Sequence, residues 1–167
     1  LSKKDFGVAF GGGTPTSELL WEQTETGESE GLSTGDVIIA GELFETGHTL
    51  IGATPTKIIF SLKKTGSASG TAELKLINSS SVEKASFGTV DMDDLDGTFT
   101  ETTLENASNT ETIADGDRLA WYYGGAQHFY IELCGTCTES NTNESYYISS
   151  WVNRSTVCTM KVYGTAA

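Results

Sequence analysis

A short acidic loop holds the residues of this chain whose types and spacing best fit metal chemistry. Residues 91–97 read DMDDLDG, so four carboxylates are followed by a glycine. Hard carboxylate oxygens are the ligands that Ca²⁺ prefers, and a bound cation would relieve the repulsion between these like charges. The loop is not an EF-hand, because Leu95 stands at the fifth position and the glycine comes one place late. A solvated acidic loop between two strands is the alternative. The predicted Ca²⁺ ligands are Asp91, Asp93, Asp94 and Asp96.

Three cysteines offer a second kind of chemistry. Cys134 and Cys137 have the spacing of a redox motif, but no strand–helix–strand pattern surrounds them. A zinc site would need His128 or another side chain as a fourth ligand, so we expect a disulfide instead. Cys158 would pair with one of the other two cysteines and tie the last strand to the sheet. Strand alternation favours Cys137–Cys158, because Cys134 follows Glu132 on the outward face.

No residue pattern marks a catalytic site. The serines lack the Gly-x-Ser-x-Gly elbow, and neither histidine stands in a pattern typical of a catalytic base. Glycoside hydrolysis needs two carboxylates across a cleft, but the chain has 23 acidic residues and no feature selects a pair. We therefore expect a protein that is not an enzyme.

Exposed aromatic rings suggest a binding surface. Tyr147 and Trp151 share one face of a predicted strand, and such rings stack on sugars. The alternative is that these side chains fill the core or its rim.

Composition narrows the class of partner. The net charge of −13 and the pI near 4.4 argue against nucleic acid and against a basic membrane-binding face. No apolar run approaches the roughly 20 residues that span a bilayer, so we expect no membrane insertion. A length of 167 residues fits one domain with a core of its own.

Several features point to the outside of the cell. The chain begins with Leu1, which suggests a mature protein whose leader was removed, and an excised segment is the alternative. Asn-x-Ser/Thr patterns fall in polar or turn-like sequence. We expect an extracellular or cell-surface protein. The predicted glycosylation sites are Asn78, Asn106, Asn143 and Asn153.

Alternation of apolar and polar residues predicts nine or ten short strands at spacings of about 8–12 residues, which is typical of an all-β sandwich or barrel. The segment 65–70 is expected to close a hairpin between two of them. The predicted strands include 37–44, 57–64, 71–78, 85–90, 98–104, 117–123, 127–133, 146–152 and 157–163.

The segment 112–133 is the strongest strand pattern, and it reads as two strands joined by a turn at Gly124 and Gly125. Period-two alternation directs one set of large side chains into the core and leaves Arg118 facing water. The predicted inward residues are Leu119, Trp121, Tyr123, Phe129, Ile131 and Leu133.

The first residues form a separate unit in the sequence. Phe6, Val8 and Phe10 alternate on one face and three glycines follow, so residues 1–13 read as a strand with a hinge and residues 14–167 as the domain. This strand pairs within its own domain, or it is donated to a neighbouring sheet through main-chain hydrogen bonds.

Five segments resemble extracellular jelly-roll domains of archaeal, bacterial and phage surface proteins. They lie between about residues 54 and 164: KIIFSLKKTG (57–66), GTAELKL (70–76), FTE (99–101), ADGDRLAWYY (114–123) and MKVYG (160–164). The resemblance implies an antiparallel sandwich of jelly-roll type. Such domains are carbohydrate-binding or adhesive modules, or subunits of filaments and tubes. Archaeal cannulae and bundling pili are similar in joining jelly rolls by an N-terminal donor strand, with calcium at the contacts of the cannulae.

Two functions follow from these patterns. The first is a non-enzymatic structural subunit of an extracellular filament or tube, which assembles with itself through strand donation and Ca²⁺. The second is a carbohydrate-binding module or adhesin that binds glycans through its aromatic residues.

Overall fold

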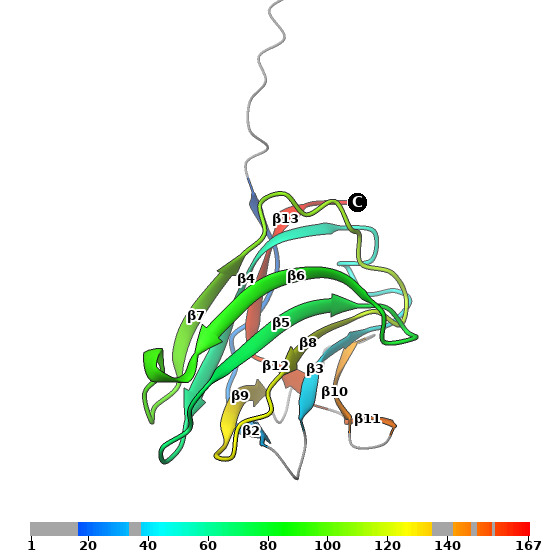
Figure 1. The fold of residues 1–167 in the computed structure, drawn as a ribbon. Helices are drawn as coiled ribbons and strands as arrows, with labels where there is room; N and C mark the ends of the chain where they lie inside the picture. The colour runs from blue at the N-terminus through cyan, green and yellow to red at the C-terminus, as the bar shows by residue number, and fades with distance from the viewer. Residues whose placement is uncertain (1–16, 34–37, 135–141, 148–149, 155) are drawn as a thin grey trace, which may run out of the picture.

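The computed structural model describes residues 17–33, 38–134, 142–147, 150–154 and 156–167. These residues form two antiparallel β-sheets packed face to face as a sandwich (Figure 1). The sandwich confirms the predicted all-β fold class, while the jelly-roll connection stays a prediction. The single helix of the described residues is the 3₁₀ turn η1 (Met92–Asp94).

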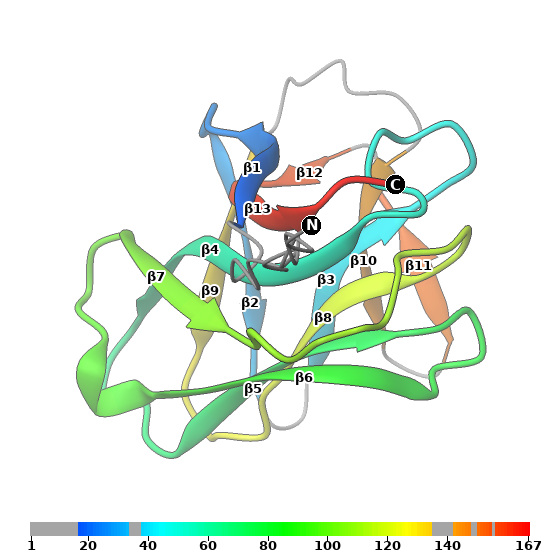
Figure 2. The ribbon, with the colours of Figure 1, turned by 90° about the horizontal axis from the view of Figure 1, so that it is seen from above.

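The first sheet has seven strands in a branched order. The main path runs β1-β13-β4-β9-β12, while β7 also pairs with β4 and β2 also pairs with β9. Seen from above, β1 and β13 lie on the side of the molecule opposite β5 and β6 (Figure 2). Its strands are β1 (Glu18–Gln23), β2 (Glu28–Leu32), β4 (Thr54–Lys64), β7 (Thr100–Glu105), β9 (Phe129–Cys134), β12 (Val157–Cys158) and β13 (Met160–Thr165).

The second sheet has six strands in the order β11-β10-β3-β8-β5-β6. Its strands are β3 (Ile39–Phe44), β5 (Thr71–Ile77), β6 (Glu83–Asp91), β8 (Arg118–Tyr122), β10 (Thr142–Tyr147) and β11 (Trp151–Asn153). The thirteen strands of the described residues exceed the predicted nine or ten. The excess arises because β1 and β2 were not predicted as strands, and because two predicted strands are each divided in two.

The core lies between the two sheets, and it contains the inward residues that alternation predicts. The inward residues of β4 are Ile58, Phe60 and Leu62, and each is fully buried. All six inward residues predicted between 112 and 133 are also buried, each at most 2% exposed. Burial of such side chains stabilises the fold by about 1.5–3 kcal/mol each.

The prediction that segment 112–133 is a hairpin is wrong. β8 belongs to the six-stranded sheet and β9 to the seven-stranded sheet, so the chain crosses between the layers at residues 123–128. Trp121 and Phe129 meet across the core instead, with ring centroids 5.3 Å apart. Both strands keep their predicted inward faces because each faces the same core from its own sheet.

The connection between β4 and β5 is the same kind of arch, so the hairpin predicted at residues 65–70 is also wrong. In contrast, β5 and β6 are consecutive and paired, from Thr71↔Asp91 to Ile77↔Glu83. The turn between them contains Ser81, the one non-glycine residue with positive φ in the described part of the chain.

Candidate functional site

The hairpin of β10 and β11 carries the aromatic residues predicted to stack on sugars. Alternation predicted one strand over 146–152, but the chain reverses there, and Tyr147 and Trp151 are direct cross-strand partners. Their ring centroids lie 5.6 Å apart in an edge-on arrangement, and both side chains are half-buried. The structure therefore brings the two predicted residues together, by pairing rather than by alternation along one strand.

A buried arginine packs against the Trp151 ring of this aromatic pair. The guanidinium carbon of Arg118 lies 4.3 Å from the centroid of the Trp151 ring, and Trp151 Nε1 donates to Ser81 Oγ at 2.9 Å. Arg118 is only 7% exposed, so the prediction that it faces water is wrong, because the indole covers it. Burial lowers the pKa of Arg118, while neighbouring Asp117 raises it. Contacts with Arg118 and Ser81 therefore hold the Trp151 side chain in one position at the surface.

A second arginine supports the same hairpin. The guanidinium carbon of Arg154 lies 4.5 Å from the Tyr146 ring centroid, and its Nη1 donates to Glu30 Oε2 at 2.6 Å. Glu30 lies on β2 of the other sheet and is 6% exposed. Arg154 therefore links β2 of the seven-stranded sheet to the β10–β11 hairpin through one ion pair and one cation–π contact, with its own side chain partly exposed.

A pocket of about 180 Å³ lies where the seven-stranded sheet divides. β4 pairs with β13 up to Phe60↔Met160 and with β9 from Leu62↔Ile131 onward, so its neighbour changes at Ser61. The connection from β1 to β2 borders this opening. We call it the fork pocket, and its principal lining residues are Ile59, Ser61, Glu101, Glu132, Met160 and Lys161.

Two polar pairs line the fork pocket. Ser61 Oγ donates to Glu132 Oε2, and Lys161 Nζ donates to Glu101 Oε1 at 2.5 Å. The hydrogen bond to Glu101 is the main cause that raises the pKa of Lys161. Sequence patterns did not reveal this site, because its residues come from four strands with no fixed spacing between them. The available signal was that Ser61 and Glu132 occupy outward positions of strongly alternating strands.

Hydrogen bonds and an ion pair within the chain fix the predicted calcium loop. Asp91 caps η1, where its Oδ1 accepts the Asp93 N–H at 2.9 Å. Lys64 Nζ donates to Met92 O at 2.5 Å and lies 3.9 Å from Asp93 Oδ1. Within the described ranges no group of three or more His, Cys, Asp or Glu side chains is placed to hold a metal. Calcium binding by Asp91, Asp93, Asp94 and Asp96 stays a prediction.

The predicted Cys137–Cys158 disulfide is wrong. Cys158 keeps its thiol and is fully buried in the core, while Cys134 is disulfide-bonded. The physical reason is the face of the sheet on which each side chain lies. Cys158 is opposite Leu133 and shares its inward face, whereas Cys134 is opposite Val157. Cys137 lies outside the described residues.

The four sequons differ in their surroundings. Asn106 Nδ2, the atom that a glycan would modify, donates to Ser86 O at 2.8 Å. Asn78 is half-buried, and its Oδ1 accepts the N–H groups of two residues of the β5–β6 turn. Asn153 is exposed on β11, and the side chain of Asn143 lies outside the described atoms. Of the three described side chains, Asn153 is therefore the most accessible to a glycosylating enzyme.

The predicted assembly strand belongs to the part of the chain before the first described residue, Ser17. Phe6, Val8 and Phe10 lie outside the described residues, as does the proposed boundary between 1–13 and 14–167. The first described strand, β1, pairs only with β13 among the described strands, and its Leu19 is 46% exposed.

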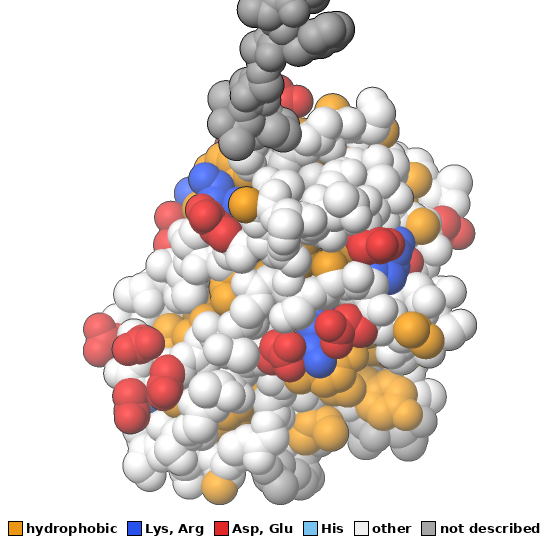
Figure 3. All heavy atoms as spheres, turned by 45° about the horizontal axis from the view of Figure 1, so that its top comes forward, with side chains coloured by type: hydrophobic (Ala, Val, Ile, Leu, Met, Phe, Trp, Pro, Cys, Tyr) orange, Lys and Arg blue, Asp and Glu red, His pale blue; other side chains and the backbone are white. Residues whose placement is uncertain are grey.

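Acidic side chains stand in small separate groups on the face seen in Figure 3, rather than in one acidic patch. Lys75 forms ion pairs with Glu73 and Glu83, at 3.1 Å and 2.9 Å. Hydrogen bonds to these two carboxylates raise the pKa of Lys75.

Comparison with known proteins assigns no relative. No protein family model matches the chain, and neither a curated protein nor a solved structure does. The described residues contain no helix with the length and apolar character that a membrane span requires.

Proposed function

We propose that this chain is a non-enzymatic structural subunit of an extracellular filament or tube. Each copy would add its segment Lys4–Phe10 as a strand to a sheet edge of the next copy. The observation that carries this proposal is the edge strand β1, which begins at Glu18, eight residues after Phe10 in the sequence, and pairs on one side only among the described strands. Open edges with apolar side chains are templates for strand addition, in which main-chain hydrogen bonds give affinity.

Two further features support this proposal. The disulfide at Cys134 favours an oxidising compartment, as outside the cell. The net charge of −13 makes identical copies repel one another, so a cation between them would favour assembly. We assign that role to Ca²⁺ at the loop of Asp91, Asp93, Asp94 and Asp96.

Electron microscopy and sedimentation velocity of the full-length chain test strand donation. Replacing Phe6, Val8 and Phe10 together with serine should abolish assembly. The matched control replaces Asp5 and Ala9 with serine, since alternation places these residues on the opposite face of the same segment. Normal assembly of the triple variant would refute strand donation.

A chelator tests the calcium part of the proposal. Filaments formed with calcium should dissociate when the chelator is added, and they should reform when calcium is restored. The variant Asp93→Asn, Asp94→Asn should lose this response. Filaments that persist unchanged in chelator would exclude calcium from assembly.

Carbohydrate binding is the second candidate, and the anchored pair of Tyr147 and Trp151 favours it. Aromatic rings held in place by an arginine present a rigid surface to a sugar. A glycan array in calcium-containing buffer should show hits that Trp151→Ala removes. Tyr163→Ala is the control, because Tyr163 is a half-buried aromatic residue on the other sheet. An array without hits would exclude this candidate.

A further inference from the structure

The shape of the fork pocket restricts its occupant to one side chain or a small molecule. Its volume of about 180 Å³ is below the roughly 300–1,000 Å³ of pockets that hold drug-sized ligands. The half-buried Ile59 gives it an apolar wall, and Glu132 and Ser61 provide polar atoms. An occupant therefore needs an apolar stem and one polar end.

The charges in the pocket select the sign of that polar end. Glu101 is paired with Lys161, whose ammonium lies 2.5 Å from its carboxylate. The half-buried Glu132 carboxylate accepts the Ser61 hydroxyl, and no described Lys or Arg side chain forms an ion pair with it. Among the described lining residues, Glu132 thus leaves one negative charge that a cation would balance. A hydroxyl donor satisfies part of this carboxylate and leaves its remaining lone pairs for another donor.

We propose that the fork pocket binds a primary ammonium group on an alkyl stem, as found in a lysine side chain. The Ile59 side chain contacts the methylene groups, while the ammonium donates to Glu132 in a charge-assisted hydrogen bond. A divalent cation fits less well, because Glu101 is already held by Lys161 and hard cations need several oxygen ligands. A stacked sugar fits less well too, because the ring of Phe60 is fully buried.

This inference does not depend on self-assembly. The same chemistry is offered by a lysine of a protein chain and by a free diamine, so the probes must separate the two sources. The first probe is Nα-acetyl-lysine methylamide and the second is 1,5-diaminopentane. Nα-acetyl-norleucine methylamide is the control for the stem, since it lacks the ammonium group.

The experiment is an amide ¹H–¹⁵N NMR titration of the full-length chain at pH 7. Binding should shift the amides of Ile59, Ser61, Glu132 and Lys161, with saturation in the millimolar range, and the norleucine control should shift none of them. Glu132→Gln keeps a carbonyl oxygen that accepts from Ser61 but removes the charge, so it should weaken binding at least tenfold. Glu105→Gln makes the same change on β7 outside the pocket and should bind normally.

Each outcome decides the proposal. Shifts with the lysine probe assign the site to a protein lysine, and shifts with the diamine alone assign it to a free amine. Equal shifts with the norleucine control, or unchanged binding by Glu132→Gln with an intact spectrum, would overturn the proposal. Absence of shifts with both amines would overturn it as well.

Discussion

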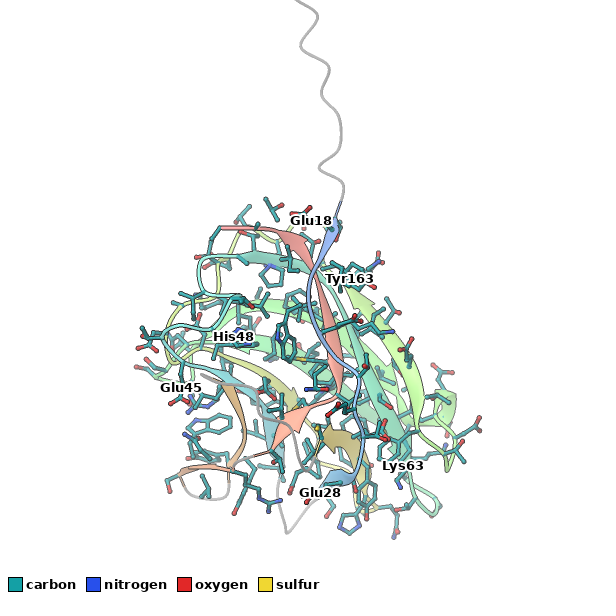
Figure 4. All side chains as sticks on the ribbon, turned by 180° about the vertical axis from the view of Figure 1, so that it is seen from behind. Glu18, Glu28, Glu45, His48, Lys63 and Tyr163 are labelled. Carbon is teal, nitrogen blue, oxygen red and sulfur yellow. The ribbon has the colours of Figure 1, made fainter. Side chains whose placement is uncertain are left out.

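The imidazole of His48 packs edge-on against the indole of Trp21, with ring centroids 5.3 Å apart. Trp21 belongs to β1 of the seven-stranded sheet, and His48 lies in the loop between β3 and β4 (Figure 4). The same imidazole lies 5.2 Å from the ring of Phe44, which ends β3 of the six-stranded sheet. His48 therefore joins the two sheets at one end of the sandwich and holds the edge strand β1 against it.

The hydrogen bonds of His48 define its protonation state. Nδ1 accepts the Leu50 N–H at 3.1 Å, so the neutral ring carries its proton on Nε2. Nε2 is buried and has no hydrogen-bond partner among the described residues. A second proton would have to go to Nδ1, where it would break the bond from Leu50 and place a charge among aromatic rings. Burial accordingly lowers the pKa of His48 to about 4, from 6.5.

We predict that stability falls with acid because of His48. The unfolded chain binds a proton at this residue below pH 6.5, whereas the folded chain does so only near pH 4. The contribution of neutral His48 is therefore complete above pH 6.5 and is lost as the pH falls from 6.5 to 4, by at most about 3 kcal/mol. Urea unfolding at pH 7.0, 6.0 and 5.0 measures this loss, and the range stays above most carboxylate titration.

Variants separate His48 from the other histidine. His48→Gln should be less stable at pH 7 but should lose less stability between pH 7 and 5 than the unmodified chain. His128→Gln is the control, because His128 lies beside Ser33 and away from His48 in the sequence. This variant should keep the full pH dependence of the unmodified chain. An unchanged pH dependence in His48→Gln would contradict this account.

Two aspartates of one turn should differ sharply in their contribution to stability. Asp117 is 2% exposed and accepts from Lys84 Nζ at 2.6 Å and from the Ala114 N–H at 2.8 Å. Asp117→Ala leaves both donors without this acceptor and should cost about 3–5 kcal/mol. Asp115 is exposed and accepts the Thr46 N–H, so Asp115→Ala should cost about 1 kcal/mol. Chemical denaturation at pH 7 compares them, and equal losses would contradict the difference in burial.

The redox states of Cys134 and Cys158 predict an alkylation pattern. Without reductant, iodoacetamide should leave Cys158 unmodified in the folded chain, because its thiol is fully buried. After unfolding in denaturant, peptide mapping should find the label on Cys158 and none on Cys134. Label on Cys134 before reduction would show that its disulfide is absent.

Gly41 should be intolerant of any side chain. A Cβ at this position of β3 would lie 1.9 Å from the Leu119 carbonyl oxygen on β8, so the strands would have to separate. Gly41→Ala should cost at least about 3 kcal/mol, as core overpacking does at its most severe. Gly97→Ala is the control, since a Cβ there would have no atom within 4 Å, and it should change stability by less than about 0.5 kcal/mol. Thermal unfolding measures both.

The sequence was informative about side-chain faces and poor about strand partners. Alternation identified Trp121 and Phe129 as inward residues, and both are fully buried. It placed them in one hairpin, although their strands lie in opposite sheets. Period two is a local property of each strand, whereas a hairpin and an arch present the same inward pattern to the core.

The candidate sites show the same limit. The sequence placed Tyr147 and Trp151 on one face of a single strand, whereas their contact arises from the pairing of two strands that the pattern did not reveal. Arg118 was assigned to water, because only the folded chain brings an indole over its guanidinium. Cys158 was assigned to a disulfide, although its position opposite Leu133 turns its thiol into the core.

By itself the sequence determined the all-β class, the acidic surface and the inward faces of the strands, since these depend on composition and on neighbours two residues apart. Tertiary structure alone decided the fork pocket and the edge-on contact between His48 and Trp21. Ser61 and Glu132 are 71 residues apart in the chain, and they meet because β4 exchanges β13 for β9 at that point. Such contacts follow from how whole sheets divide and pack, and no local pattern of residues encodes them.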